Sequence, residues 1–182
     1  MAKRALLVLA GFGILLSAAY FSATSASQEF TATTRDVSPF AYCCIEHQGP
    51  FTDIESVIGQ LMQALQAQNI MPRGPMVGVY YNSPDQVQPQ ELKWEIGFPV
   101  TEQASPLAPL VKKVWEYKTV VAAVHVGPYE QTGDTIAKVM DWMTQQGYFP
   151  AGPSLERYLD MDPSKVDPGK LRTEIWIPVN KK

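Results

Sequence analysis

Two glutamates near the ends of similar segments, Glu95 and Glu174, are the candidates for chemistry in this sequence. Each lies in an apolar run typical of a β-strand, where neighbouring side chains point to opposite faces. Glu174 therefore shares a face with Trp176, and Glu95 shares one with Gly97. A carboxylate beside aromatic faces suits a planar or cationic organic molecule, and a carboxylate in an apolar cleft can also act as a general base.

Further aromatic residues fall near loop ends or on candidate cleft faces of the same two segments. The predicted ligand-binding set is Glu174, Trp176, Tyr158, Tyr80, Glu95, Tyr129 and Trp142. The alternative is structural: the two glutamates would be solvated strand residues or partners of Lys93 and Arg172, and each aromatic ring would pack in the core.

These residues occur twice because the chain carries an internal repeat. Alignment of the chain with itself places His47, Gly49 and Pro50 on His125, Gly127 and Pro128, and a single insertion in a later loop then aligns the last strands. We interpret the repeat as a duplication, with repeat one at about 31–100, a linker at 101–109 and repeat two at about 110–180.

Each repeat is predicted to form a strand, a helix and two further strands. Thr52 and Glu55 resemble a capping box at the start of the first helix, and an apolar stripe at helical spacing follows in both copies. The predicted strands cover 30–35, 40–47, 77–81, 92–100, 111–115, 119–126, 155–159 and 171–179. The expected fold class is α+β, a pseudo-twofold duplication with antiparallel sheets and one main helix per repeat.

The N-terminal segment, 1–26, differs from the rest of the chain in composition. Lys3 and Arg4 precede an uncharged stretch that ends in small residues, which is typical of a secretory signal peptide, with an uncleaved membrane anchor as the alternative. Residues 27–182 are then one exported domain, periplasmic or anchored outside the cytoplasm. Membrane contact is expected only through the N-terminal segment, if it is retained.

Charge and cysteine usage exclude several function classes. Loss of Lys3 and Arg4 would leave 13 basic against 18 acidic residues, a net charge of −5, without the basic clusters that nucleic-acid binding needs.

Cys43 and Cys44 are adjacent in a predicted strand, so we expect two buried thiols on opposite faces. His47 and His125 precede matching Gly-Pro turns, which favours structural roles, and we predict no metal site and no cofactor.

The His-Val-Gly-Pro-Tyr turn at 125–129, the helix after it and the terminal run at 173–179 together resemble the GyrI-like family, which shares the effector-binding domain of AraC-type and MerR-type regulators. The resemblance implies a cleft between two modules that binds hydrophobic, often cationic molecules. It also implies that Glu174 is the central ligand contact and that Tyr158 and Trp176 stack on the ligand. Unlike the regulators, this chain has no room for a helix-turn-helix domain and carries an export leader.

The leading hypothesis is therefore a binder of a hydrophobic, possibly cationic small molecule outside the cytoplasm, without DNA binding. One alternative is a hydrolase of electrophilic small molecules with Glu174 as general base. A second alternative is a SOUL-like haem binder, which would need His47 or His125 at an open face.

Overall fold

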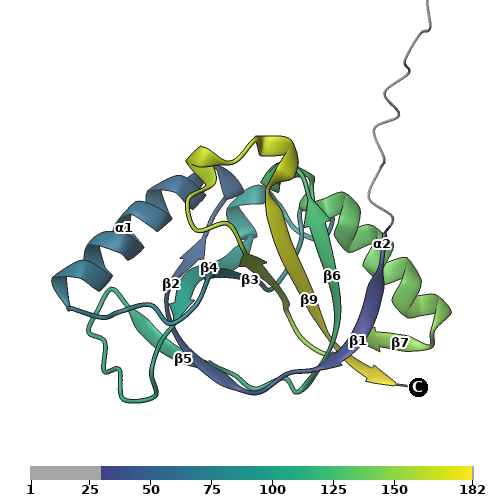
Figure 1. Ribbon diagram of the computed structural model, residues 1–182, viewed down its shortest axis with the longest axis horizontal. Helices are drawn as coiled ribbons and strands as arrows, with labels where there is room; N and C mark the ends of the chain where they lie inside the picture. The colour runs from purple at the N-terminus through teal and green to yellow at the C-terminus, as the bar shows by residue number, and fades with distance from the viewer. Residues whose placement is uncertain (1–29, 182) are drawn as a thin grey trace, which may run out of the picture.

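A computed structural model describes residues 30–181 of the chain (Figure 1). The predicted leader at 1–26 lies outside these residues. The first half contains one main helix and four strands. They are β1 (Ala32–Asp36), β2 (Phe40–Gln48), α1 (Ile54–Ala67), β3 (Met76–Tyr80) and β4 (Lys93–Pro99).

The second half follows the same order, with one additional short strand that the sequence did not predict. Its elements are β5 (Val111–Trp115), β6 (Thr119–Val126), α2 (Thr132–Gln145), β7 (Tyr148–Pro150), β8 (Ser154–Tyr158) and β9 (Arg172–Lys181). The α+β class, the strand order and one main helix per half are as predicted. That the halves arose by duplication stays an interpretation of the aligned residues.

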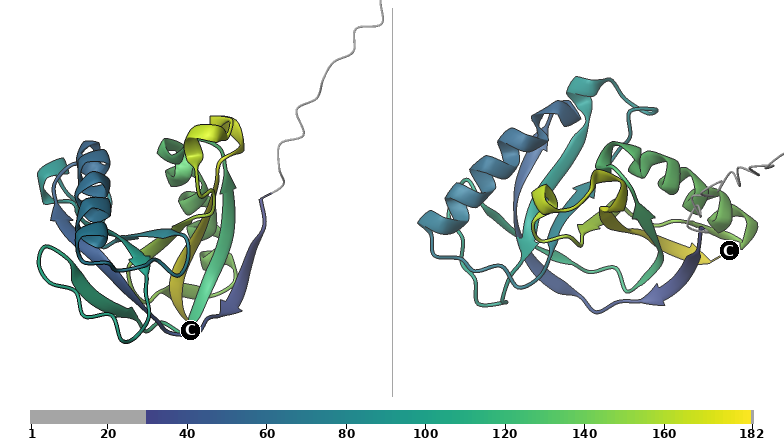
Figure 2. Two further views of the ribbon diagram at one scale, coloured as in Figure 1. Left: turned by 60° about the vertical axis from the view of Figure 1, so that its left-hand side comes forward. Right: turned by 45° about the horizontal axis from the view of Figure 1, so that its top comes forward.

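The two halves join edge to edge through an antiparallel pairing of β3 with β8. The strand order is β1-β6-β9-β8-β3-β4-β2-β5, with β7 added beside β9. We expected a separate antiparallel sheet in each half, but the pairing of β3 with β8 in the middle joins the two into one sheet. Both helices consequently pack on the same side, α1 over β2 and β4 and α2 over β6, as the two inclined wings in Figure 2 illustrate.

Strand alternation decides which residues face the helices. Ile96 and Trp94 pack under α1, and Ile175 and Ile177 pack under α2, as the period of two predicts. The adjacent Cys43 and Cys44 are buried free thiols in different clusters on opposite faces of β2. We call the side that carries α1 and α2 the helix face and the other side the helix-free face.

The helix-free face buries a hydrophobic cluster without a helix above it. Val120, Cys44 and Leu155 are fully buried there. The rings of Phe40 on β2 and Trp176 on β9 lie 6.4 Å apart, although three strands separate β2 from β9. In a flat sheet those two strands would be about 19 Å apart. The sheet therefore curls around this cluster, which shields it from water.

The two histidines tie each helix start to the strand before it. His47 Nε2 lies 2.8 Å from the Asp53 carboxylate. His125 Nδ1 lies 2.9 Å from the Thr135 hydroxyl, and its Nε2 lies 3.1 Å from the Pro128 carbonyl oxygen. The predicted capping box of Thr52 and Glu55 is wrong: a 3₁₀ turn over Phe51–Asp53 leads into α1, and no side chain caps the helix.

Within residues 30–181, no helix is long and apolar enough to cross a membrane. The same part of the chain contains no group of three or more His, Cys, Asp or Glu side chains that could hold a metal ion.

Candidate functional site

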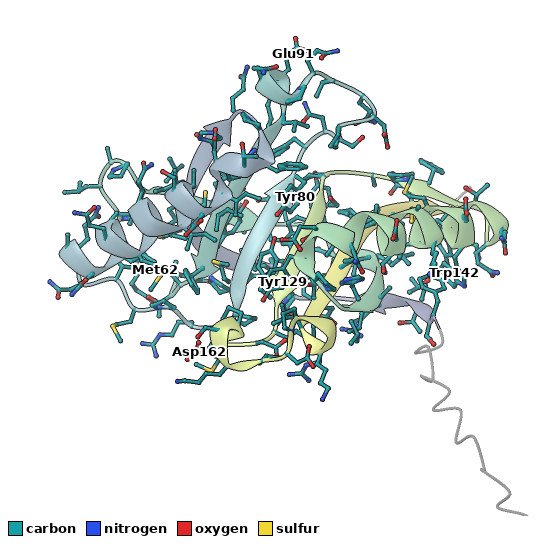
Figure 3. The ribbon with its side chains drawn as sticks, turned by 90° about the horizontal axis from the view of Figure 1, so that it is seen from above. Met62, Tyr80, Glu91, Tyr129, Trp142 and Asp162 are labelled. Carbon is teal, nitrogen blue, oxygen red and sulfur yellow. The ribbon has the colours of Figure 1, made fainter. Side chains whose placement is uncertain are left out.

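A cluster of polar and aromatic side chains lies on the helix face where the two halves meet. Gly78 of β3 is the direct strand partner of Glu156 on β8. Tyr80 and Tyr158 lie two residues further along their strands and share this face. Because α1 covers one wing and α2 the other, the middle of the sheet is left to these four residues. Figure 3 shows Tyr80 and Tyr129 between the two helices.

Glu156 is buried without a cationic partner. Its residue is 5% exposed, and within residues 30–181 no Lys, Arg or His side chain forms an ion pair with it. Burial raises the pKa of this carboxyl group to about 7, although hydrogen bonds from Tyr158 and Thr132 act in the opposite direction. The Tyr158 hydroxyl donates to Glu156 Oε2 over 3.0 Å. Glu156 therefore changes charge near neutral pH.

Two tyrosines cover the buried carboxyl group. The hydroxyl oxygens of Tyr80 and Tyr158 lie 2.6 Å apart. Burial raises the pKa of both phenols well above the ordinary value, so both stay neutral hydrogen-bond donors. Phe51 packs edge-on against Tyr80, and Tyr129 packs edge-on against Tyr158, with ring centroids 5.6 and 5.2 Å apart.

The tyrosine pair needs a glycine beneath it. A Cβ atom on Gly78 would lie 2.8 Å from the Tyr80 hydroxyl oxygen and 3.0 Å from that of Tyr158. Both distances are too short for an unstrained contact. Gly78, which the repeat aligns with Glu156, thus supplies space where its counterpart supplies a carboxyl group.

This arrangement is suited to a cation with an apolar body. A carboxylate inside a ring of aromatic faces can balance a positive charge, and the rings add cation–π attraction. A carboxyl group that titrates near neutral pH can also exchange a proton with a bound molecule. We call Glu156, Tyr80, Tyr158, Gly78, Tyr129 and Phe51 the central cluster.

The predicted centre of the site, Glu174 with Trp176, lies on the opposite face of the sheet. Glu174 Oε1 accepts from Arg35 over 2.5 Å, and Oε2 accepts from Arg157. The Arg157 guanidinium also lies 4.7 Å from the ring centroid of Trp176. Both oxygens of Glu174 are thus occupied by the protein's own cations, as the structural alternative allowed, although with different partners.

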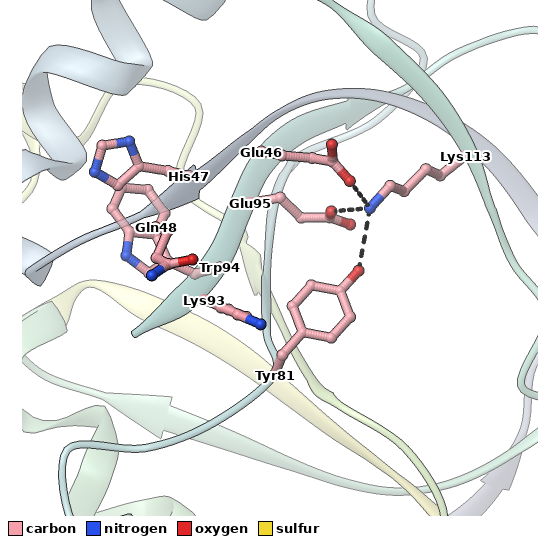
Figure 4. Close-up of a pocket in the computed structure, with 8 residues that line it drawn as sticks. All are labelled: Glu46, His47, Gln48, Tyr81, Lys93, Trp94, Glu95 and Lys113. Carbon is pink, nitrogen blue, oxygen red and sulfur yellow. Dashed lines mark hydrogen bonds and ion pairs between the residues drawn. The ribbon is translucent and has the colours of Figure 1, made fainter. Parts of the chain in front are cut away.

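Glu95 is the corresponding residue of the first half and is also occupied. Its residue is 1% exposed, and it accepts from Tyr42 and from Lys113, each over 2.5 Å. Lys113 also pairs with Glu46 over 2.6 Å (Figure 4). Beside this network is an open pocket of about 440 Å³, lined by Glu46, His47, Gln48, Tyr81, Lys93, Trp94, Glu95 and Lys113.

We expected Glu95 and Glu174 to line one acidic hollow between the halves. They do point to the same side, but Val77, Val79 and Leu155, each at most 1% exposed, fill the sheet between them. The packed middle of one shared sheet therefore separates the two carboxylates.

The predicted set is therefore divided into three groups. Tyr80, Tyr129 and Tyr158 belong to the central cluster, whereas Glu95, Glu174 and Trp176 lie on the helix-free face. Trp142 stacks on Tyr148, with ring centroids 6.2 Å apart. It lies ten residues further along α2 than Thr132, the helix residue that contacts Glu156, which is about 15 Å along the helix axis (Figure 3).

Sequence reasoning missed Glu156. The information was present, because Tyr158 was a candidate and a residue two positions earlier on a strand shares its face. The repeat alignment also placed this carboxylate opposite Gly78. The predicted carboxylates came from the last strand of each half, where the family resemblance also places the ligand contact, and this led to Glu174.

Comparison with known proteins agrees with this fold. The model of the GyrI-like small molecule binding domain matches residues 33–180. A search of curated proteins gave no match. The C-terminal domain of EcmrR has a TM-score of 0.75 at 19% identity, covering 84% of this chain and 99% of that domain. The longer EcmrR chain in its DNA complex has the same TM-score, 0.75, at 18% identity, and the present chain spans 58% of its length.

Two further solved structures share this fold. A protein described as a hydrolase from Listeria innocua has a TM-score of 0.60 at 14% identity, over 82% of this chain and 91% of that one. SAV2435, solved with bound tetraphenylphosphonium, has a TM-score of 0.56 at 14% identity, over 82% and 94% of the two chains. At these identities the solved structures show a shared fold. The family assignment rests instead on the family model, which matches most of the sequence. The chain belongs to the GyrI-like small molecule binding domain family.

Proposed function

We propose that this domain binds a hydrophobic organic cation at the central cluster, with Glu156 as the counter-ion. The observation that carries the proposal is a carboxyl group, 5% exposed, that has no cationic partner in the described structure and is surrounded by aromatic rings. A buried charge without a partner is costly to a folded protein. A bound cation would supply that partner, and the rings of Tyr80, Tyr129 and Phe51 would contact its apolar body.

Access requires a small local change. The hydrogen bond between Tyr80 and Tyr158 closes over Glu156, so a ligand must part the two hydroxyl groups. One such bond contributes about 1 kcal/mol, which favourable contacts with a ligand can exceed. Tyr80, Tyr129 and Phe51 are only partly buried and can move toward solvent.

Tetraphenylphosphonium is the appropriate probe, because it is a permanent cation with an apolar surface and SAV2435 was solved with it bound. Calorimetric titration of the domain at pH 8 should show saturable binding by the wild type. Glu156→Gln keeps the shape of the side chain and removes its charge, and we expect an affinity loss on the order of a hundredfold. Glu130→Gln, an exposed acid of the turn before α2, is the matched control and should bind as the wild type does. Equal affinity of Glu156→Gln and the wild type would refute the proposal.

The domain acts outside the cytoplasm in this proposal, without DNA binding. The basic, apolar and small-residue order of the segment 1–26 and the net charge of −5 of the remainder support it. Cell fractionation of the full chain, with mass spectrometry of its N-terminus, tests the location and tells a cleaved leader from a retained anchor.

A hydrolase of electrophilic small molecules is the second candidate, with the general base at Glu156 instead of Glu174. The pKa of Glu156, about 7, is matched to proton transfer at neutral pH, whereas Glu174 is held by two guanidinium groups. Turnover of epoxide or cyclopropane compounds that disappears in Glu156→Gln would establish it. Binding of such compounds without turnover would leave the domain a binder.

A further inference from the structure

Arg157 connects the central cluster to the helix-free face. It lies on β8 between Glu156 and Tyr158, the two cluster residues of that strand. Its side chain points to the opposite face, where it pairs with Glu174 and lies over Trp176. The strand that carries the buried carboxyl group and its phenol partner is therefore held from behind by one guanidinium group.

Glu174 is the anchor of this arrangement. Its side chain is 8% exposed, and it binds Arg35 on β1 as well as Arg157 on β8. Because β6 and β9 separate β1 from β8, this one carboxylate joins side chains across four adjacent strands. Hydrogen bonds between a carboxylate and guanidinium groups are among the strongest in proteins, and burial limits their screening by salt.

The first half of the molecule provides an internal comparison. In the alignment that places Tyr80 on Tyr158, Val79 occupies the position of Arg157 and Gly78 that of Glu156. In the alignment of the last strands, Gly97 occupies the position of Trp176. The first half therefore lacks the central carboxyl group and also lacks the guanidinium group and the indole on the other face. The second half has all three.

Accordingly, we propose that Arg157, held by Glu174 and Trp176, is a positioning residue that fixes Glu156 and Tyr158 for the ligand. The inference rests on the proposed function of the central cluster. Precise placement is needed there, because Gly78, the strand partner of Glu156, offers no side chain to hold it from the β3 side. Supporting contacts of this kind keep a binding group in its productive geometry.

The test compares two guanidinium groups that bind the same carboxylate. Arg157→Gln removes the one on β8, and Arg35→Gln removes the one on β1, which lies three strands away from β8. With tetraphenylphosphonium as probe at pH 8, we expect Arg157→Gln to bind on the order of tenfold more weakly and Arg35→Gln to stay within about twofold of the wild type. Melting temperatures of both variants are measured in parallel, so that a general loss of stability is separated from a loss of position.

Two further variants keep the inference open to refutation if Arg157→Gln does not fold. Arg157→Lys retains a cation for Glu174 and should restore most of the affinity, a rescue that a purely steric role would not give. Glu174→Gln should weaken binding about as much as Arg157→Gln does. Equal effects of Arg35→Gln and Arg157→Gln, or wild-type affinity in both Glu174→Gln and Arg157→Gln, would overturn the inference. Absence of binding by the wild type itself would instead refute the proposed function.

Discussion

The two faces of the sheet treat buried carboxyl groups in opposite ways. On the helix-free face, Glu95 and Glu174 are each held by cations of the protein itself. On the helix face, Glu156 is equally buried but has only hydroxyl donors within the described part of the chain. Burial therefore does not distinguish a structural carboxylate from a candidate binding residue. The distinguishing feature is whether the protein supplies the balancing charge.

The helix-free face also explains why two halves of similar sequence cooperate. Lys113, on the first strand of the second half, binds Glu95 of the first half, and Arg35, on the first strand of the first half, binds Glu174 of the second. Arg35 and Lys113 occupy corresponding positions of the repeat, with the same spacing as His47 and His125. Each half thus balances a charge of the other, which ties the edge strands β1 and β5 to the opposite wing.

The largest effect is expected where a paired charge loses its cation. Lys113→Met leaves Glu95 buried at 1% exposure, with Tyr42 as its remaining partner. An uncompensated buried charge is strongly destabilising, so the free energy of unfolding should fall by about 3 kcal/mol. Urea unfolding at pH 7 measures it, with Lys138→Met, an exposed position on α2, as the control that should change little. Equal stability of the two variants would contradict the assignment of Lys113 as a structural partner.

On the helix face, removal of a buried charge is expected to raise the free energy of unfolding instead of lowering it. The pKa of Glu156 is raised from 4.5 to about 7, so the folded state keeps a proton that the unfolded chain has released. This contribution to stability is present below pH 4.5 and is lost as the pH rises to 7. Glu156→Gln, which stays neutral, should therefore exceed the wild type in free energy of unfolding at pH 8 by up to roughly 3 kcal/mol, with little difference at pH 4. Loss of stability at pH 8 would show that the carboxylate is compensated in the free protein.

The same titration should control ligand affinity. A permanent cation binds the ionised form of Glu156, and the ionised fraction rises about tenfold between pH 6 and pH 8 for a pKa of about 7. Tetraphenylphosphonium affinity should rise by a similar factor over that range. Calorimetric titrations at several pH values measure it, and Glu156→Gln should remove the dependence. A flat profile in the wild type would place the binding charge elsewhere.

The smallest effect is expected from the bond that closes the cluster. Tyr80→Phe removes one hydroxyl group of the 2.6 Å pair and leaves its ring against Phe51. The free protein should lose about 1 kcal/mol of stability. Ligand affinity should rise by up to about fivefold, because binding no longer has to break this bond. Thermal unfolding and the same titration measure both, and a large loss of affinity would instead make the Tyr80 hydroxyl a direct ligand contact.

Much of the fold followed from residue patterns. The alternation of Ile175 and Ile177 against Glu174 and Trp176 correctly predicted which side chains pack with those of α2, because strand geometry is local. The helix stripes and the turns were recognisable for the same reason. The capping box failed because a 3₁₀ turn over Phe51–Asp53 includes Thr52, so that α1 begins only at Ile54.

The arrangement of the candidate residues was less predictable. The structure brings Tyr80, Tyr129 and Tyr158 together, but the carboxyl group beside them is Glu156, whereas the sequence analysis had grouped Glu174 with them. Period-two alternation predicts which residues share a face of a strand. It does not predict which face of the sheet formed by the two joined halves leaves a carboxyl group without a cation. That depended on the pairing of β3 with β8, two strands that lie far apart in the chain.

The sequence by itself determined the order of the elements, the faces of each strand and the correspondence between the two halves, because these depend on short-range periodicity and on direct alignment. Only the tertiary structure decided that the halves share one sheet, that Arg35, Arg157 and Lys113 balance the carboxylates of the helix-free face, and that no cation within residues 30–181 pairs with Glu156. Charge balance inside a protein depends on which distant side chains meet after folding, and no local pattern in the chain records that.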